Sequence, residues 1–224
     1  TLARSSAASD VYKRQVAGVT AEVFNSSGTY LTSATTDASG NYTVTGLSAG
    51  SDTVCFEASQ ATGAPATGYL SQCYKGIAWD GSSAPPSGTT SVTASAGSTQ
   101  GNINASLTTA AGISGTVTAA ADSGALADVT VDVYGSGSRL IGQATTDSSG
   151  AYTVGGLSAG SETVCFDASG ASGSSTTGYQ SQCYNGVAWD GSATLPTGTT
   201  SVTTTDGATK SGICLLYTSD AADE

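Results

Sequence analysis

One segment of the chain occurs twice: ATTDASGNYTVTGLSAGSDTVCFEAS at Ala34–Ser59 and ATTDSSGAYTVGGLSAGSETVCFDAS at Ala144–Ser169. The offset of 110 residues, from Ala34 to Ala144, contains no gap. The same offset relates Thr67–Gly81 to Thr177–Gly191 and Ser87–Thr93 to Thr197–Thr203. A repeated unit of this size suits one small all-β domain, so the repeat predicts two such domains in tandem.

Apolar residues alternate with polar ones around this segment. Val129, Val131 and Val133 alternate with Thr130 and Asp132. A period of two, with turn residues between the runs, predicts antiparallel strands that are half-buried in a β-sandwich. The expected strands include Ile113–Val117, Val129–Val133, Arg139–Thr145, Ala151–Val154, Val164–Ala168 and Thr200–Thr204 in repeat 2, and Ile103–Leu107 in repeat 1. The stretch between Cys55 and Thr89 is rich in Gly, Ser, Ala and Pro, and we expect an ordered insertion there.

The composition excludes several classes of function. The chain has no histidine and a formal net charge of −11. Nucleic-acid binding by neutralisation of phosphates requires clustered basic residues, and the acidic balance argues against it. No run of apolar residues reaches the length of a membrane span.

The two ends of the chain have an unusual relation. Ser5–Gln15 reads SSAASDVYKRQ and Cys214–Glu224 reads CLLYTSDAADE. One short DNA encodes the first segment directly and the second as its reverse complement, and this DNA resembles the transposase adapter of short-read library preparation. We therefore expect translated adapter at both ends, as in a metagenomic fragment. The expected division is adapter at 1–15, repeat 1 without its first strand at 16–111, repeat 2 without its last strand at 112–213, and adapter at 214–224.

The cysteines predict one crosslink per repeat. Each copy contains one pair, Cys55 with Cys73 and Cys165 with Cys183. Cys55 lies in the outward phase of its strand, since Val54 and Phe56 take the inward phase, so the crosslink would hold the insertion over the outer face of the sheet. Two thiols without histidine do not make a metal site. Disulfides indicate a compartment outside the cytoplasm.

The pattern T-D-x-x-G-x-Y occurs at Asp37–Tyr42 and Asp147–Tyr152. An Asp side chain accepts hydrogen bonds from nearby backbone amides, and Gly supplies a positive φ, so the pattern predicts a hairpin turn. The alternative is a calcium site, which would need further oxygen ligands from residues such as Asp52, Asp128 or Asp132.

Aromatic residues gather in the insertion. The candidate ligand-binding residues are Tyr74, Trp79, Asp80, Tyr184, Trp189 and Asp190. Aromatic rings stack on sugar rings, and carboxylates bind sugar hydroxyls. The alternative is that each tryptophan packs against the disulfide as a small core.

The sequence contains no catalytic constellation. Without histidine, no Ser-His-Asp or Cys-His system is available. We expect Asp128 and Asp132 to lie on one strand, on an outer face in solvent, where burial does not shift either pKa. The prediction is a protein that is not an enzyme, with no catalytic residue, metal or cofactor.

These residues resemble a known family. The order V-T-V-x-V followed by T-T-D-x-x-G-x-Y-x-V-x-x-L-x-A-G-x-x-x-V resembles the carboxypeptidase regulatory-like (transthyretin-like) domains. It is also similar to the B-type stalk repeats of bacterial surface adhesins. The insertion, with G-Y-x-S-Q-C-Y-x-G-x-A-W-D-G, resembles a version found in secreted actinobacterial proteins. The resemblance implies two Ig-like (prealbumin-like) sandwiches with an accessory role. Adhesin repeats with a Lys–Asn crosslink carry a first-strand lysine, which Gly112–Ala119 lacks.

Two functions follow as expectations. The first is a non-catalytic, extracellular spacer or surface-display module of a larger secreted protein. The alternative is a carbohydrate-binding, starch-binding-like accessory of a secreted hydrolase. The expected partners are polysaccharide or cell-surface components. We expect no nucleic-acid partner and no membrane span in this fragment. Exposed tryptophans coplanar with neighbouring tyrosines would favour sugar binding, and tryptophans buried on the disulfide would favour the spacer.

Overall fold

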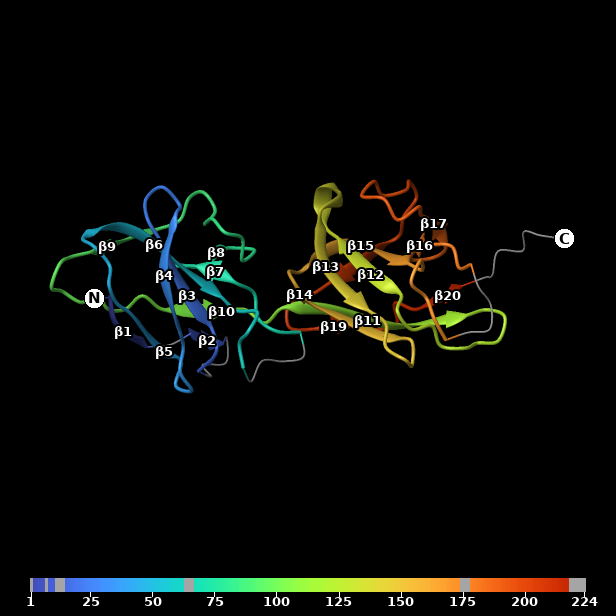
Figure 1. Ribbon diagram of the computed structural model, residues 1–224, viewed down its shortest axis with the longest axis horizontal. Helices are drawn as coiled ribbons and strands as arrows, with labels where there is room; N and C mark the ends of the chain where they lie inside the picture. The colour runs from blue at the N-terminus through green and yellow to red at the C-terminus, as the bar shows by residue number, and fades with distance from the viewer. Residues whose placement is uncertain (1, 7, 11–14, 63–66, 174–177, 218–224) are drawn as a thin grey trace. The chain divides into compact units, whose positions relative to one another are not determined.

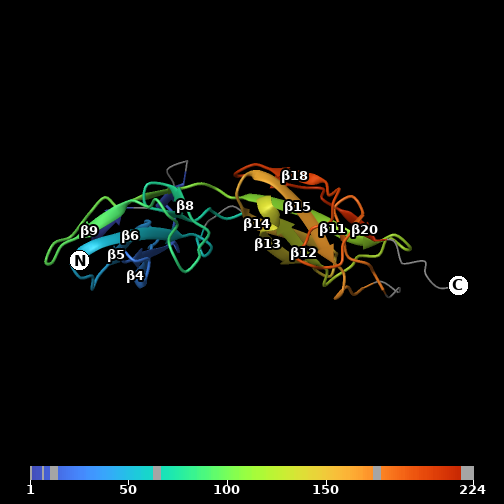
Figure 2. The same ribbon diagram turned by 90° about the horizontal axis from the view of Figure 1, so that it is seen from above.

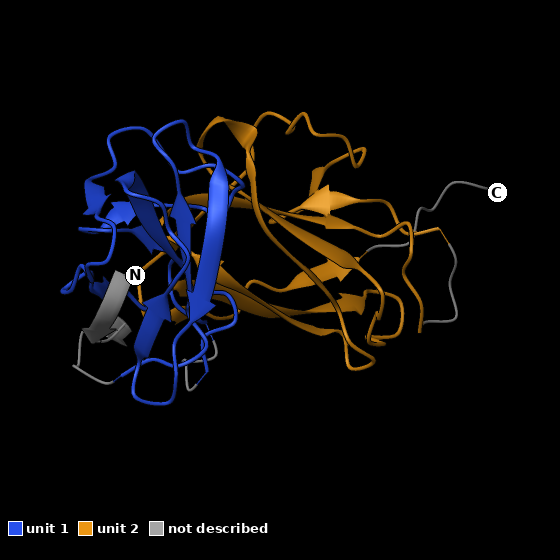
Figure 3. Ribbon diagram, turned by 60° about the vertical axis from the view of Figure 1, so that its left-hand side comes forward, with its two compact units in different colours: residues 1–109 blue, residues 110–224 orange. Residues whose placement is uncertain are grey.

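The computed structural model describes residues 2–6, 8–10, 15–62, 67–173 and 178–217 (Figure 1). The chain divides into two compact units, Thr1–Thr109 (unit 1) and Ala110–Glu224 (unit 2), which Figure 3 colours separately. Among the described residues the regular structure is β-strand, apart from a short 3-10 turn at Ser136–Ser138. The predicted all-β class is confirmed. The expected limits of the repeats depend on the origin of the two ends, and they stay predictions.

Unit 2 contains a large antiparallel sheet. Its strand order is β13 (Leu140–Thr145), β12 (Thr130–Tyr134), β15 (Gly160–Asp167), β16 (Gln182–Cys183) and β17 (Val187–Ala188), with β18 (Ser201–Thr204) on β15. Figure 2 shows β18 beside β15. The short strands β16 and β17 lie in the insertion, so this segment extends the sheet instead of forming a separate layer.

The second layer of unit 2 is built on β11 (Ala111–Ala119). It pairs antiparallel with β14 (Ala151–Leu157) and parallel with both β19 (Thr209–Lys210) and β20 (Leu215–Tyr217). Inward residues of both layers, among them Val131 and Val154, share one buried cluster. Burial of this apolar alternation between two sheets is what makes the unit a β-sandwich.

Unit 1 repeats the arrangement. Its large sheet has the order β4 (Tyr30–Thr35), β3 (Thr20–Phe24), β6 (Gly50–Glu57), β7 (Gln72–Cys73) and β8 (Ile77–Ala78), with β9 (Ser91–Ala94) on β6. In its other layer β1 (Leu2–Ser6) pairs antiparallel with β5 (Asn41–Val44), and β10 (Ala105–Leu107) pairs parallel with β2 (Ala8–Asp10). The sandwich fold is therefore antiparallel in most of its pairs, and the parallel ones involve the last strands.

The repeated turn pattern joins the two layers. The Asp37 carboxylate accepts hydrogen bonds from the backbone amides of Ser39 and Asn41 at 2.8 and 2.9 Å, which closes the predicted hairpin turn. The tyrosine that follows the turn is buried, and the Tyr42 hydroxyl donates to the carbonyl of Ile103 at 2.6 Å. The T-D-x-x-G-x-Y pattern thus shapes one hairpin and anchors the segment that leads into β10.

The same contacts occur in unit 2. The Asp147 carboxylate accepts from the amides of Ser149 and Ala151, and the Tyr152 hydroxyl donates to the carbonyl of Ile213 at 2.6 Å. The equal geometry follows from the equal sequence pattern, because backbone amides and one phenol make all of these bonds.

Strands are present at both positions where a terminal strand was expected to be missing. β1 and β2 lie within residues 2–10, and β20 lies within residues 215–217. Residues 1, 7, 11–14 and 218–224 of the two end segments lie outside the described residues. The adapter origin of these segments stays a prediction, since strand pairing does not report how a sequence arose.

Candidate functional site: the disulfide-linked insertion

Each unit contains the predicted disulfide. Cys55 is bonded to Cys73 and Cys165 to Cys183, and all four residues are fully buried. The partners lie directly opposite each other in the ladders β6–β7 and β15–β16. As expected from the strand phase, these cysteines belong to small clusters separate from the main core. The crosslink therefore joins the first strand of the insertion to its neighbour within the large sheet, and the disulfide lies on the outer side of that sheet.

In unit 1 the tryptophan covers this disulfide. Trp79 retains 7 % of its exposure and forms a small cluster with Phe24, Cys55 and Cys73. The rings of Trp79 and Phe24 meet edge to face, with centroids 6.0 Å apart. The indole N–H donates to the carbonyl of Ala84 at 3.2 Å. The indole is thus satisfied by the protein on its polar edge and covered on its faces.

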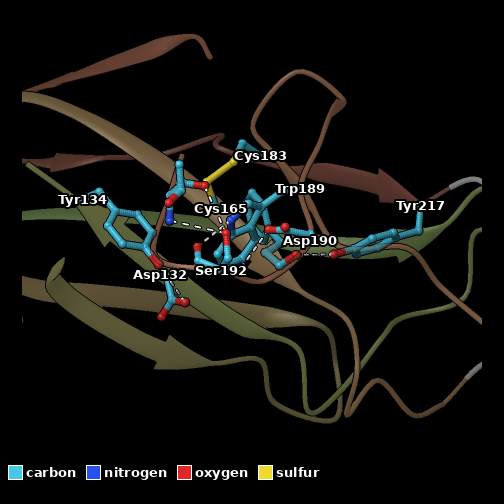
Figure 4. Close-up of a disulfide and its surroundings, with 10 residues drawn as sticks. Asp132, Tyr134, Cys165, Cys183, Trp189, Asp190, Ser192 and Tyr217 are labelled. Carbon is cyan, nitrogen blue, oxygen red and sulfur yellow. Dashed lines mark hydrogen bonds between the residues drawn. A yellow bond between two sulfur atoms is a disulfide. The ribbon is translucent and has the colours of Figure 1, made fainter. Parts of the chain in front are cut away.

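Unit 2 has the same arrangement, shown in Figure 4. Trp189 is 7 % exposed and packs with Cys165, Cys183 and Tyr134. The centroids of the Tyr134 and Trp189 rings are 6.2 Å apart, and the indole N–H donates to the carbonyl of Ser192 at 2.9 Å. Both tryptophans therefore meet the geometric condition set above for the spacer.

The aspartates beside the tryptophans are exposed and shape their own loops. Asp80 accepts from the amide of Ser82 at 3.0 Å, and Asp190 accepts from the amide of Ser192 at 2.9 Å. Hydrogen bonds from the Ser192 side chain and backbone lower the pKa of Asp190. Turn formation accounts for these contacts, because the Asp side chain caps the amide two residues onward.

The tyrosines named as candidates lie apart from the tryptophans. Tyr74 and Tyr184 are half-buried and pack against the main sandwich cores of their units. Each follows directly after an outward-facing cysteine, so it points to the opposite side of the strand. The structure therefore does not bring tryptophan and tyrosine together in one flat platform, and the ligand-binding role of these six residues stays a prediction.

The expected placement of Asp128 and Asp132 on one strand in solvent is wrong. Asp132 is only 8 % exposed, and the Gln143 side chain donates to its carboxylate at 2.7 Å. The Tyr134 hydroxyl also points to Asp132, at 3.5 Å. Burial, followed by the charge of Asp132, raises the pKa of Tyr134. Asp128 precedes the strand, is exposed, and accepts from the Ser172 hydroxyl at 2.6 Å.

The outer position equivalent to Asp132 in unit 1 also carries an acid, Glu22. Glu22 is half-buried, and its pKa is raised by burial and then by the charge of Glu57. The Glu57 carboxylate accepts a hydrogen bond from the backbone amide of Ser59 at 2.7 Å.

The turn aspartates are engaged by their own turns, and the calcium alternative stays a prediction. Hydrogen bonds from the Ser149 side chain and the amides of Ser149 and Ala151 lower the pKa of Asp147, which indicates that its carboxylate is already engaged. Within the described ranges, no three His, Cys, Asp or Glu side chains lie close enough to hold a metal ion. In the same part of the chain, no helix is long and apolar enough to span a bilayer.

Sequence reasoning missed two buried acids, Asp52 and Glu162. Asp52 was considered only as a calcium ligand, and Glu162 was not considered. The strand phase contained the signal, because Asp52 lies two residues before Val54 and Glu162 two residues before Val164, and both valines point into the core. The two acids are 5 % and 3 % exposed.

Comparisons with known proteins found distant structural similarities alone. No protein-family model and no curated protein matches the chain. A streptococcal ancillary pilin is 15 % identical, with 97 % of this chain and 62 % of that chain covered and a TM-score of 0.42. The minor pilin GBS52 of Streptococcus agalactiae is 13 % identical, with coverages of 93 % and 85 % and a TM-score of 0.37. The Bacillus anthracis TIE protein is 13 % identical, with a TM-score of 0.33.

The chain spans 33 % of the TIE protein and 62 % of the ancillary pilin. At these identities and TM-scores the similarities carry no functional argument. The sandwich fold rests on the strand pairing and the two buried cores of the chain itself.

Proposed function

We propose that the chain is a non-catalytic structural module of an extracellular protein, in which two disulfide-bonded sandwiches serve as a spacer or display element. The observation that carries the proposal is the burial of Trp79 and Trp189 on the disulfides. The aromatic residues of the insertion are used to cover a crosslink, and this use leaves their faces unavailable for a ligand.

The disulfides support the extracellular location, because such bonds persist in oxidising compartments. They also suit a module that bears load. Each closes a loop with a sequence separation of 18 residues between directly paired strands. When such a unit is pulled from its ends, the residues inside the loop cannot extend.

Single-molecule force spectroscopy on the full chain tests the mechanical part. Each unit should gain less length on unfolding when its disulfide is intact than after the disulfide has been reduced. The difference should be about 60 Å, which is the extended length of the enclosed loop. A Cys55→Ala/Cys73→Ala variant should show the longer step in unit 1 alone. Equal steps before and after reduction would contradict the proposal.

Binding of polysaccharide is the competing outcome. The full chain should pass through gels that contain soluble starch, xylan or chitosan without retardation, and a panel of esterase, peptidase and glycosidase substrates should stay at background. Asp80→Asn/Asp190→Asn is the diagnostic variant, and Asp122→Asn is its control at an exposed turn. Retardation by one polysaccharide that the diagnostic variant abolishes and the control retains would replace the spacer with a carbohydrate-binding module.

A further inference from the structure

An acidic side chain lies at the same place inside each sandwich. Asp52 on β6 and Glu162 on β15 occupy equivalent positions of the repeat, opposite Val92 and Val202 on the neighbouring strands. Their exposures are 5 % and 3 %, and each is in the inward phase of its strand. A buried ionised carboxylate is costly unless its oxygens are paired, so two such residues at one repeat position require an explanation.

One oxygen of each carboxyl group has no partner. Oδ2 of Asp52 and Oε2 of Glu162 are buried and make no hydrogen bond with any described residue. The other Glu162 oxygen, Oε1, lies against Gly160. If residue 160 carried a Cβ atom, that atom would lie 2.5 Å from Oε1. The Glu162 carboxyl is thus enclosed by its own strand and by β18, on which Thr204 is also buried.

The charged groups around these acids do not neutralise them. Of the strands that pair with β6, β3 carries the acid Glu22. Glu22 lies opposite Cys55, which is in the outward phase, so it is on the other side of the sheet from Asp52. β7 and β9 carry no ionisable group. The titratable residues buried in the same apolar core are the tyrosines Tyr42 and Tyr69, and the half-buried Tyr74 packs against it. No base lies on any of these strands, so Asp52 has no counter-ion among them.

In unit 2 three strands pair with β15. β12 carries Asp132 and Tyr134, and β16 and β18 carry no ionisable group. The core contains Tyr152 and Tyr217, whose pKa values are both raised by burial, so both stay neutral. Lys210, on β19 of the second layer, is exposed.

We propose that Asp52 and Glu162 are matched proton-controlled switches, one in each unit, that hold their sandwich most firmly when protonated and loosen it as the surroundings approach neutral pH. The region that loosens is the end of the ladder that joins β6 to β9 and β15 to β18. A protonated carboxyl is neutral and tolerates the core. An ionised one requires water at its unpaired oxygen, which opens this end of the sandwich.

The direction of the effect follows from proton linkage. Burial raises the pKa of Asp52 above its ordinary 3.8. Burial also raises the pKa of Glu162 above its ordinary 4.5, and it outweighs the hydrogen bonds from Thr204 and the backbone that lower this pKa. The folded state therefore binds these protons more tightly than the unfolded state. Their contribution to stability is complete below the unfolded pKa values and is lost as pH rises through the folded ones. Acids with a lowered pKa, such as Asp147, act in the opposite sense.

Thermal unfolding of the full chain between pH 3.5 and pH 8 tests the proposal. Asp52→Asn/Glu162→Gln should match the wild type at pH 3.5 and melt higher at pH 8, by about 4–8 °C. Asp122→Asn, which replaces an exposed carboxylate at a turn, is the matched control and should not reproduce the gain of the double variant at pH 8. Amide hydrogen exchange should locate the pH-dependent opening in β9 and β18. A difference between the double variant and the wild type that is the same at every pH would overturn the proposal.

Carboxyl ¹³C NMR titration of the wild type keeps the test decisive if the double variant does not fold. The Asp52 and Glu162 signals should titrate above the ordinary values of their residue types. Titration of both at or below those values would equally overturn the proposal.

Discussion

The last strands of the two units take equivalent places but bury different side chains. β10 buries Ala105 and Leu107, whereas β20 buries Leu215 and Tyr217. The pattern of buried, exposed and buried residues is the same in both strands. Tyr217 is larger than Leu107, and its hydroxyl donates to the carbonyl of Phe166 at 3.0 Å.

The insertion absorbs this difference in volume. Next to the small Leu107, Tyr69 is only 4 % exposed and its backbone forms a bridge with Thr109. Next to Tyr217, the equivalent Tyr179 is half-buried, and the two rings meet with centroids 5.6 Å apart. Closely packed interiors cannot take an extra ring without a shift elsewhere. The comparison teaches that backbone pairing sets the place of the last strand, while the insertion adjusts to its side chains.

The outer clusters differ in polarity. Phe24 is fully buried between Tyr30 and Trp79 in unit 1. Its counterpart Tyr134 adds a hydroxyl, and the neighbouring acid is Asp132. The same crosslinked cluster therefore accepts a polar atom where a partner is within reach.

Removal of the tryptophans has the largest expected effect. Trp79→Ala and Trp189→Ala should each lower the free energy of unfolding of their unit by about 3–5 kcal/mol, because a large buried ring leaves a cavity beside the disulfide. Urea unfolding followed by unit-resolved hydrogen exchange measures both. Trp→Phe variants should retain part of the loss. An effect near zero in one unit would mean that its tryptophan is not part of a core.

Removal of the crosslinks comes next. Cys55→Ala/Cys73→Ala and Cys165→Ala/Cys183→Ala should each cost about 3 kcal/mol, since a loop of this length gains chain entropy in the unfolded state. The two losses of unfolding free energy should be equal, because both disulfides close loops with the same sequence separation of 18. Unequal losses in urea unfolding would point instead to the different neighbours Phe24 and Tyr134.

An exchange at the last strands breaks the comparison directly. Leu107→Tyr should lower the unfolding free energy by about 1–3 kcal/mol, because Tyr69 already fills the space. Tyr217→Leu should cost about 1–3 kcal/mol, because the carbonyl of Phe166 loses its hydrogen bond and the smaller side chain leaves space beside Tyr179. In that variant Tyr179 should become less accessible to nitration. Unchanged nitration of Tyr179 would contradict the link between the two tyrosines.

The smallest expected effect concerns Thr204, which is Ala94 in unit 1. Thr204→Ala should cost about 1 kcal/mol near pH 4, because the hydroxyl accepts from the amide of Gly160 at 3.1 Å and donates to the carbonyl of Ser158 at 3.2 Å. Burial raises the pKa of Glu162 and the hydrogen bond of Thr204 lowers it, so removal of the hydroxyl should raise this pKa further. The stability of unit 2 should then fall over a wider pH range above 4.5. Thermal unfolding from pH 4 to pH 8 measures this, and a narrower range would refute the assignment.

Much of the fold was predictable from local pattern. Alternation of period two located the strands, the even pair of cysteines in each copy predicted both disulfides, and the Asp and Gly of the repeated turn predicted the hairpins. These features depend on neighbours within a few residues, and the repeat doubles the evidence for each. The parallel pairing of β10 and β20 was not predictable, because it depends on which distant strand lies beside the last one.

The sequence by itself determined that the chain forms two all-β units, each with its own crosslink. Strand phase and cysteine pairing depend on the spacing of residues within one copy of the repeat. Only the tertiary structure decided which way the chemistry-bearing side chains face. For Trp79 and Trp189 the sequence favoured a small core on the disulfide and left a sugar platform as the alternative, and in the fold both rings pack on the disulfides. Asp132 read as a solvated acid, but Gln143 and Tyr134 enclose it. Burial depends on what lies across the sheet and over it, and the side chains that cover a residue come from segments far away in the sequence.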